Sequence, residues 1–287
     1  MYPEKFDYYR AASVAEALSL LGEHPEAKLL AGGHSLLPVM KLRLADPGVL
    51  IDIGRIAELK GITVENGRTR IGALTTHAMV EAARDLPHAL PEAAGWIGDP
   101  MVRNRGTVGG NIAHADPASD LPTVFIALGA TMHIAGAGGT RSVAADDFFV
   151  DLFATALGDR EILTAVEVPS RVGGTGSAYA KMFNPASRYA VVGAAALISV
   201  QGARCTGARI AVGGLTPTAT RCAAVEAALI GKKLDEATIA AAAQQVAGDL
   251  DADLLVGDIH ASAAYRRQMA PVFLARAITS AAERAGG

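Results

Sequence analysis

The sequence is poor in cysteine, with only Cys205 and Cys222 among its 287 residues. Two thiols outside a CxxC pair are too few for a four-cysteine iron–sulfur cluster or a structural zinc site. The N-terminus carries charges where a secretory signal needs an apolar run, so we expect both thiols to be buried and reduced. The seven histidines lack metal-ligand spacing, so no metal site is predicted.

Aromatic residues are also scarce, at 5%, and charged residues make up 19% with a formal net charge of −3. The core must therefore be built from Ala, Val, Leu and Ile, and no stripe of Lys and Arg indicates a nucleic-acid partner. The longest strongly apolar stretch, residues 190–200, is far shorter than the roughly 20 residues of a membrane-spanning helix. We expect no transmembrane segment and a cytoplasmic protein, with peripheral association at the inner face of the membrane as an alternative.

The first predicted unit, residues 1–54, alternates strands and a helix. Ser13 and Glu16 form a capping box ahead of a helix whose apolar residues recur at helical spacing. Short apolar strands at 28–31 and 50–54 complete a small βαβ-like unit.

The middle unit, residues 55–176, mixes strands with short helices. Its predicted elements are strands at 68–72, 131–135 and 162–168, a helix capped by Thr75 or Thr76 that runs through Ala83, and a helix at 91–97. The glycine-rich segment 171–176 has no apolar periodicity and is the predicted linker to the last unit.

The last unit, residues 177–287, is predicted to be a separate α+β domain. Strands at 194–200 and 207–212 flank a turn-rich segment, a pattern typical of an antiparallel hairpin. Alanine-rich helical stretches follow at 221–230, 235–247 and 261–284.

Two glycine-rich segments carry the functional signal, AGGHSLLP at 31–38 and VRNRGTVGGN at 102–111. Paired glycines lack Cβ and permit positive φ, so backbone amides can converge on an anion such as a pyrophosphate. Ser35, Thr107 and Asn111 would add side-chain donors to the same oxygens. The structural alternative is that each glycine pair only makes a tight turn.

Neither segment is a standard nucleotide fingerprint. No GxGxxG opens a helix after a strand, and no GxxxxGK[ST] is present, so neither a Rossmann site nor a phosphate loop is supported. The AGAGG segment at 135–139 is similar to a dinucleotide turn but lies in a hairpin context, and residues 173–177 belong to the linker.

Segment 31–38, together with RNRGTVGGN at 103–111 and ASDLP at 118–122, resembles the FAD-binding medium subunits of the xanthine-oxidase-type molybdenum hydroxylases. The pattern is most similar to the aerobic carbon monoxide dehydrogenase type, and the resemblance covers essentially the whole chain. It implies an α+β fold of the vanillyl-alcohol-oxidase/murein-reductase (PCMH) type. FAD would lie extended between the first two units. A C-terminal α+β domain, a small antiparallel sheet plus helices, would cover the flavin end.

The resemblance also implies a set of cofactor-binding residues and no catalytic residue on this chain. The set is Ala31, Gly32, Gly33, His34, Ser35, Thr107, Val108, Gly109, Gly110, Asn111, His114, Asp120, Leu163, Lys181 and Tyr189. Residues 31–35 would wrap the diphosphate through backbone amides, and residues 107–111 would form the facing wall. A side chain at Gly32 or Gly109 is therefore expected to crowd the pyrophosphate.

The later positions have individual roles in the resemblance. Asp120 would accept hydrogen bonds from hydroxyls of the sugar-like chain of the cofactor, and Leu163 would pack on the adenine side. Lys181 would lie near the flavin end, where Tyr189 could gate acceptor access. His114 occupies a family contact position. The alternatives are a structural histidine at His114 and an ordinary surface lysine at Lys181.

The resemblance implies an electron-transfer role within a complex. Substrate would be oxidised at a molybdopterin centre on a large subunit, and electrons would pass through [2Fe–2S] clusters on a small subunit to FAD on this chain and then to an external acceptor. The complex is expected to be a dimer of heterotrimers. Alternatives are a stand-alone FAD oxidase of the same fold, a medium subunit of a hydroxylase for N-heterocycles, purines or aldehydes, and a non-catalytic nucleotide-binding scaffold.

Overall fold

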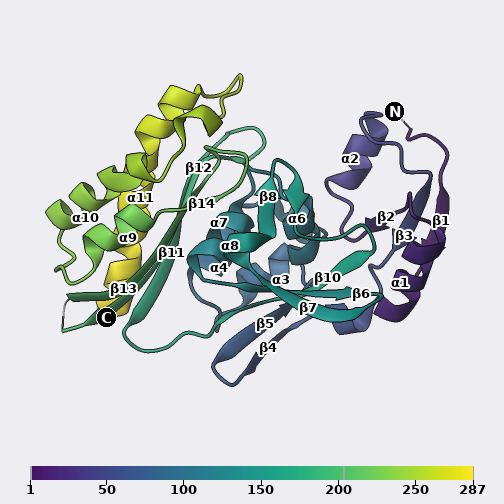
Figure 1. Ribbon diagram of the computed structural model, residues 1–287, viewed down its shortest axis with the longest axis horizontal. Coiled ribbons are helices and arrows are strands. Elements are labelled where there is room, and N and C mark those ends of the chain that lie inside the picture. The colour runs from purple at the N-terminus through teal and green to yellow at the C-terminus, as the bar shows by residue number, and fades with distance from the viewer. Residues whose placement is uncertain (1, 203, 287) are drawn as a thin grey trace.

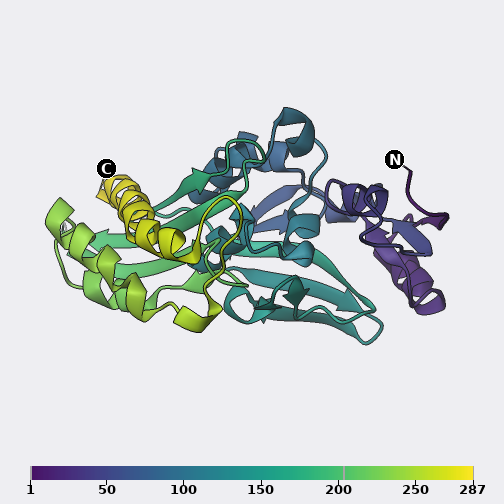
Figure 2. The same cartoon turned by 90° about the horizontal axis from the view of Figure 1, so that it is seen from above.

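The computed structural model describes residues 2–202 and 204–286. Its N-terminal and C-terminal parts lie at opposite ends of the molecule, with the middle part between them (Figures 1 and 2). Each part has its own sheet and its own cluster of buried apolar side chains. The predicted α+β class is therefore confirmed.

The N-terminal part is a three-stranded parallel sheet with two helices. Its elements are β1 (Asp7–Arg10), α1 (Val14–Glu23), β2 (Lys28–Leu30), α2 (Leu36–Lys41) and β3 (Val49–Asp52), and the strand order is β1-β3-β2. The predicted capping box starts α1, because the Ser13 hydroxyl accepts from the Glu16 amide and the Glu16 carboxylate accepts from the Ala12 amide.

The middle part is built on a five-stranded antiparallel sheet. Its strands, in spatial order, are β4 (Ile62–Glu65), β5 (Arg68–Gly72), β10 (Glu161–Pro169), β6 (Thr131–Gly136) and β7 (Gly139–Ala144). The other elements are η1 (Ala57–Leu59), α3 (His77–Ala82), α4 (Ala89–Trp96), α5 (Pro100–Arg103), α6 (Val108–His114), α7 (Asp120–Ala127), α8 (Ala145–Phe148), β8 (Phe149–Asp151) and β9 (Ala154–Thr155). Every residue of α7 is buried, so this helix lies at the centre of the molecule.

The C-terminal part is a four-stranded antiparallel sheet covered by helices on one face (Figure 2). Its strands are β11 (Thr175–Phe183), β12 (Ala190–Gln201), β13 (Arg204–Gly213) and β14 (Thr220–Arg221), in that order. Its helices are α9 (Ala223–Leu229), α10 (Glu236–Ala243), η2 (Gln244–Gly248), η3 (Ala252–Leu254) and α11 (Ala263–Gly286).

Most predicted elements are confirmed, including the β12–β13 hairpin and the turn between β6 and β7. The predicted linker was wrong at its end, because Thr175 and Gly176 already belong to β11. Gly176 is a packing position, since a Cβ there would lie 2.6 Å from the Ala285 amide nitrogen of α11. The glycine pattern therefore concealed the start of a strand that the sequence did not predict.

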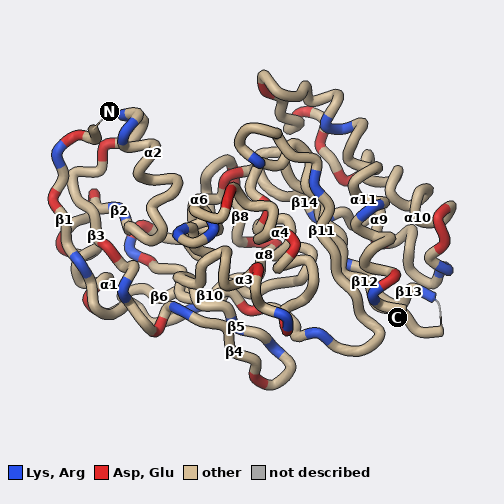
Figure 3. Tube along the Cα trace, turned by 180° about the vertical axis from the view of Figure 1, so that it is seen from behind, with Lys and Arg blue, Asp and Glu red and all other residues tan. Residues whose placement is uncertain are grey.

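The structure agrees with what the composition and the charge of the sequence predict. The buried core consists mainly of Ala, Val, Leu and Ile, and both cysteines are buried and free, as expected. Acidic and basic residues are interspersed along the chain rather than gathered by sign (Figure 3). Within the described ranges, no helix combines the length and apolar character needed to cross a membrane.

Candidate cofactor site

The two glycine motifs lie against each other, the first from the N-terminal part and the second from the middle part. A Cβ at Gly32 would overlap the Arg105 carbonyl oxygen and lie 3.0 Å from the Gly106 Cα. A Cβ at Gly110 would lie 3.7 Å from the Ala31 Cβ. The motifs therefore approach at the distance of backbone contact, which only glycine permits at Gly32.

The first motif, in the β2–α2 connection, presents free backbone amides. Among the hydrogen bonds of the described residues, none is donated by the amides of Gly32, Gly33, His34 or Ser35. Gly33 has φ +74°, a conformation that turns successive amides toward one side. The Ser35 hydroxyl makes no capping bond to α2 and is also free. Consecutive free amides and a hydroxyl fit the oxygens of a diphosphate.

The second motif has its amides engaged. Val108 donates to the Thr75 carbonyl at 2.9 Å, Gly109 to the Ala73 carbonyl at 2.7 Å, and Gly110 to Thr107 Oγ1 at 3.2 Å. These bonds fix the start of α6 to the connection between β5 and α3. The motif is therefore a rigid wall rather than a second set of amide donors.

The wall glycines explain why this segment cannot carry larger residues. A Cβ at Gly109 would lie 2.5 Å from the Ala73 Cβ and 2.9 Å from the Ala73 carbonyl oxygen. Bulk at Gly32 or Gly109 would thus first strike neighbouring protein atoms. The structure shows crowding of the contact between segments at both positions, and the expected crowding of the pyrophosphate stays a prediction.

Two polar side chains of the wall keep donors available. Thr107 Oγ1 caps α6 by accepting from Gly110, and Asn111 Oδ1 accepts from the Ser119 hydroxyl at 2.7 Å. Each bond uses an acceptor and leaves the Thr107 hydroxyl proton and the Asn111 amide protons free. The Asn111–Ser119 bond also ties the wall to Asp120, the first residue of α7.

A buried ion pair lies beyond the wall. Lys181 Nζ is 2.8 Å from the Asp120 carboxylate, which also accepts from the Tyr179 hydroxyl at 2.6 Å. Asp120 is 4% exposed and Lys181 7%, so Lys181 is not a surface lysine. Burial raises the pKa of Asp120 and lowers that of Lys181, and each shift is opposed by the charge of the partner. The Trp96 carbonyl, 3.4 Å from Nζ, is a second acceptor.

Tyr189 lies at the exposed edge of this region. It follows Arg188, whose φ is +61°, in a loop held by the Asn184 side chain, which accepts from two loop amides. Partial burial, together with the charges of Asp116 and Asp120, raises the pKa of Tyr189. The position is suitable for a side chain at the mouth of a site.

The remaining two predicted residues, His114 and Leu163, have other neighbours in the structure. The His114 ring, at the end of α6, lies 5.1 Å from the Phe153 ring. Leu163 is 5% exposed, packs in the core of the middle part, and stands at a register shift of β10. The predicted contacts of both side chains with the cofactor stay predictions.

Sequence reasoning missed three residues that shape the site: Tyr179, Ser119 and His77. Tyr179 could have been found, because it precedes Lys181 by two positions and side chains two apart share a face of a strand. The hydroxyl of Ser119 and the imidazole of His77 gave no such signal, since their surroundings depend on tertiary packing.

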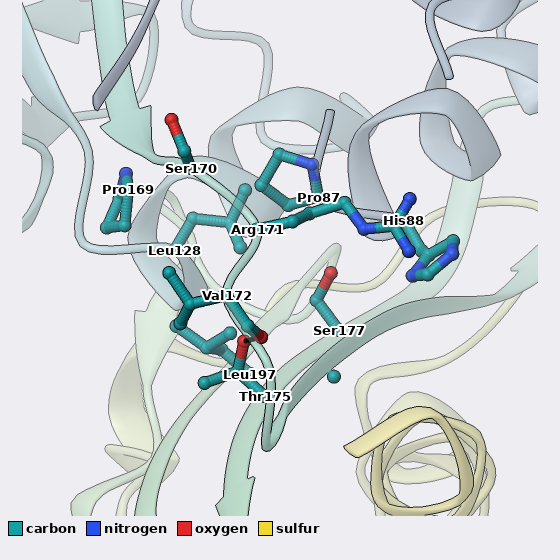
Figure 4. Close-up of a pocket in the computed structure, with 11 residues that line it drawn as sticks. Pro87, His88, Leu128, Pro169, Ser170, Arg171, Val172, Thr175, Ser177 and Leu197 are labelled. Carbon is teal, nitrogen blue, oxygen red and sulfur yellow. Dashed lines mark hydrogen bonds between the residues drawn. The ribbon is translucent and has the colours of Figure 1, made fainter. Parts of the chain in front are cut away.

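One cavity, of about 70 Å³, lies elsewhere, between the middle and C-terminal parts (Figure 4). Pro87, His88, Arg171 and Leu197 are among its lining residues, and no residue of either glycine motif lines it. Its volume is too small for a dinucleotide. Across residues 2–202 and 204–286, no group of three or more His, Cys, Asp or Glu side chains could hold a metal ion.

Comparison with known families assigns nearly the whole chain. Residues 4–171 match the FAD binding domain in molybdopterin dehydrogenase, and residues 177–281 match the CO dehydrogenase flavoprotein C-terminal domain. The carbon monoxide dehydrogenase medium chain of Hydrogenophaga pseudoflava is 40% identical, covering 98% of each chain. The 6-hydroxypseudooxynicotine dehydrogenase complex subunit alpha of Paenarthrobacter nicotinovorans is 38% identical, over 99% of this chain and 97% of the relative.

Solved structures agree. Carbon monoxide dehydrogenase from Hydrogenophaga pseudoflava superimposes with a TM-score of 0.94 at 42% identity, covering 99% of each chain. A Cu,Mo-CO dehydrogenase gives 0.94 at 36% identity, over 99% of this chain and 100% of the other. The predicted family is confirmed: this chain belongs to the FAD-binding medium subunits of the molybdopterin dehydrogenases, oxidoreductase subunits of carbon monoxide dehydrogenase type whose cofactor is FAD.

Proposed function

We propose that this chain is an electron-relay subunit. It accepts electrons from [2Fe–2S] clusters on a small subunit and passes them to an external acceptor, while a large molybdenum subunit oxidises the substrate. The observation that carries the proposal is the pairing of four consecutive free amides, at Gly32–Ser35, with an anchored wall that continues to a buried Asp120–Lys181 pair.

The chain's contribution is binding and orientation. The amides of residues 32–35 and the Ser35 hydroxyl hold the diphosphate, and Thr107 and Asn111 donate from the facing wall. The bound flavin supplies the redox chemistry, storing up to two electrons between donor and acceptor. The polar groups converge on one cofactor, as they do in sites that bind a ligand in a fixed orientation.

The buried ion pair serves the flavin end in this proposal. Lys181 is held by Asp120 and by the Trp96 carbonyl, so its ammonium group has little freedom to move. A fixed positive charge stabilises negative charge that develops on a neighbouring group. Asp120 acts mainly by holding Lys181, and it accepts from the cofactor's hydroxyls as a second role. Tyr189 gates access of the acceptor from the exposed edge.

The substrate of the complex is determined outside this chain. Relatives include carbon monoxide dehydrogenase, nicotine 6-hydroxylase and caffeine dehydrogenase subunits, at 40%, 36% and 32% identity. Carbon monoxide is the first candidate, because two carbon monoxide dehydrogenase chains are among these relatives, at 40% and 38%. N-heterocycles, purines and aldehydes are the alternatives.

Native purification with quantification of flavin, iron and molybdenum tests the relay. We expect a complex with large and small subunits, arranged as a dimer of heterotrimers, holding one FAD and two [2Fe–2S] clusters per molybdenum. A lone flavin-containing chain that oxidises a substrate by itself would favour a stand-alone oxidase. A chain purified without flavin or partners would contradict both functions.

A further inference from the structure

A buried histidine lies at the junction of the two glycine motifs. His77, the first residue of α3, is 3% exposed, and its Nδ1 has no hydrogen-bond partner among the described residues. Its amide donates to the Gly106 carbonyl at 3.0 Å. A buried imidazole nitrogen without a partner is uncommon, because most buried polar atoms are hydrogen-bonded.

The imidazole and the first motif share a neighbour. A Cβ at Gly106 would lie 2.7 Å from His77 Cδ2 and 2.9 Å from Nε2, so the ring packs directly on that glycine. Gly106 also contacts the first motif, since its Cα would lie 3.0 Å from a Cβ at Gly32. Gly106 thus lies between the His77 ring and the first motif, and it contacts both.

Two basic side chains lie near this ring. His34 faces it from the first motif, and Arg103 faces it from α5. Arg103 is paired with Glu81, which lies on α3 itself, at 2.7 Å. Burial, followed by His34 and then Arg103, lowers the pKa of His77 to about 4, so the ring is neutral at pH 7 in the chain without cofactor.

We propose that His77 is a positioning residue that takes up a proton from solvent when the FAD diphosphate binds at the first motif. The inference rests on the proposed site, in which the amides of residues 32–35 hold the diphosphate. The only bond formed is N–H on the imidazole, and the diphosphate keeps its negative charge. The cation then offsets that charge from behind Gly106.

The pH dependence follows from the sign of this coupling. An opposite charge placed nearby favours the charged form of a group and shifts its pKa by about one to three units. The pKa of His77 is therefore higher with FAD than without it. FAD affinity should rise as the pH falls from 8 toward 5, and it should level off below the pKa of the FAD-free chain.

Titration calorimetry of the FAD-depleted full chain tests the coupling. FAD is added at pH 5 in two buffers with different ionisation enthalpies, and the difference in heat gives the protons taken up. We expect uptake of a sizeable fraction of one proton by the wild type, loss of that fraction in His77→Gln, and no change in His88→Gln. Unchanged uptake in a folded His77→Gln variant would overturn the proposal.

Histidine-ring NMR of the wild type decides the matter even if His77→Gln does not fold. With labelled histidine at pH 5, the His77 ring should be mainly neutral without FAD and at least half cationic with FAD. A ring that stays neutral in both states would overturn the inference while leaving the FAD site intact. A folded wild-type chain that binds no FAD would instead overturn the proposed site, and this inference with it.

Discussion

The two glycine motifs look alike in sequence but use their backbone amides differently. In the first, the amides of residues 32–35 donate to no protein group among the described residues, whereas in the second those of Val108, Gly109 and Gly110 are all engaged. One motif thus leaves its amides free for the proposed ligand, and the other uses its amides to hold its own position. Similar composition does not imply a similar role, because the role depends on what the neighbouring segments already satisfy.

The largest expected effect is that of breaking the buried Asp120–Lys181 ion pair. Lys181→Met leaves the Asp120 carboxylate buried without its cation, and the free energy of unfolding should fall by about 3–5 kcal/mol. The pKa of Asp120 is raised by burial, and an acid with a raised folded-state pKa contributes stability that is lost as the pH rises through that pKa. The variant should therefore regain stability when the pH is lowered from 7 toward 5, as measured by thermal unfolding.

The double variant Asp120→Asn/Lys181→Met is the control for that prediction. It removes both charges, so it should be more stable at pH 7 than Lys181→Met alone. A single variant with wild-type stability at pH 7 would show that the pair is not needed to compensate a buried charge.

Gly109→Val should come next, because its side chain would collide with Ala73. We expect a loss of about 1–3 kcal/mol of folding stability together with loss of bound FAD. Gly138→Ala is a matched control, since a Cβ at Gly138 meets no atom within 4 Å. Chemical unfolding and flavin absorbance of both variants give the two readouts, and wild-type stability in Gly109→Val would refute the anchoring role.

Gly32→Ala should affect cofactor binding more than folding. Its Cβ would overlap the Arg105 carbonyl and push the two motifs apart, although the first motif is a partly exposed loop. We expect FAD affinity to fall by about 100-fold or more, equivalent to about 3 kcal/mol. Fluorescence titration with FAD measures the loss, and full FAD occupancy would defeat the assignment of this motif.

The smallest expected effects come from removing one hydroxyl in each motif, and they compare the two motifs directly. Ser35→Ala removes a hydroxyl that caps no helix, so FAD affinity should fall by about 10-fold with stability unchanged. Thr107→Ala removes the cap of α6 and should cost about 1 kcal/mol of stability as well. Equal loss of stability in both variants, measured by thermal unfolding, would contradict the division of roles.

Much of the fold was predictable because local signals coincide with it. The capping box at Ser13 and the β12–β13 hairpin depend on residues close in sequence. The motifs and their order were sufficient to identify the family. Strand β11 was missed because its first residues, Thr175 and Gly176, look like a linker, and Gly176 is required by a helix more than 100 residues away.

The two glycine motifs of the proposed site could be recognised in the sequence, but the different engagement of their amides could not. Nothing in the sequence of residues 107–111 shows that the amides of Val108 and Gly109 donate to Thr75 and Ala73, because those bonds depend on tertiary packing. The orphaned nitrogen of His77 is invisible for the same reason. Residue type shows which hydrogen bonds a group can make, and only the fold shows which donors and acceptors remain without a partner.

Hydrogen exchange of individual backbone amides, with and without FAD, tests the central claim most directly. The amides of Gly32–Ser35 should exchange quickly in the FAD-free chain and become protected when FAD binds. The amides of Val108–Gly110 should be protected in both states. Protection by FAD at Val108–Gly110, with no change at Gly32–Ser35, would contradict the account.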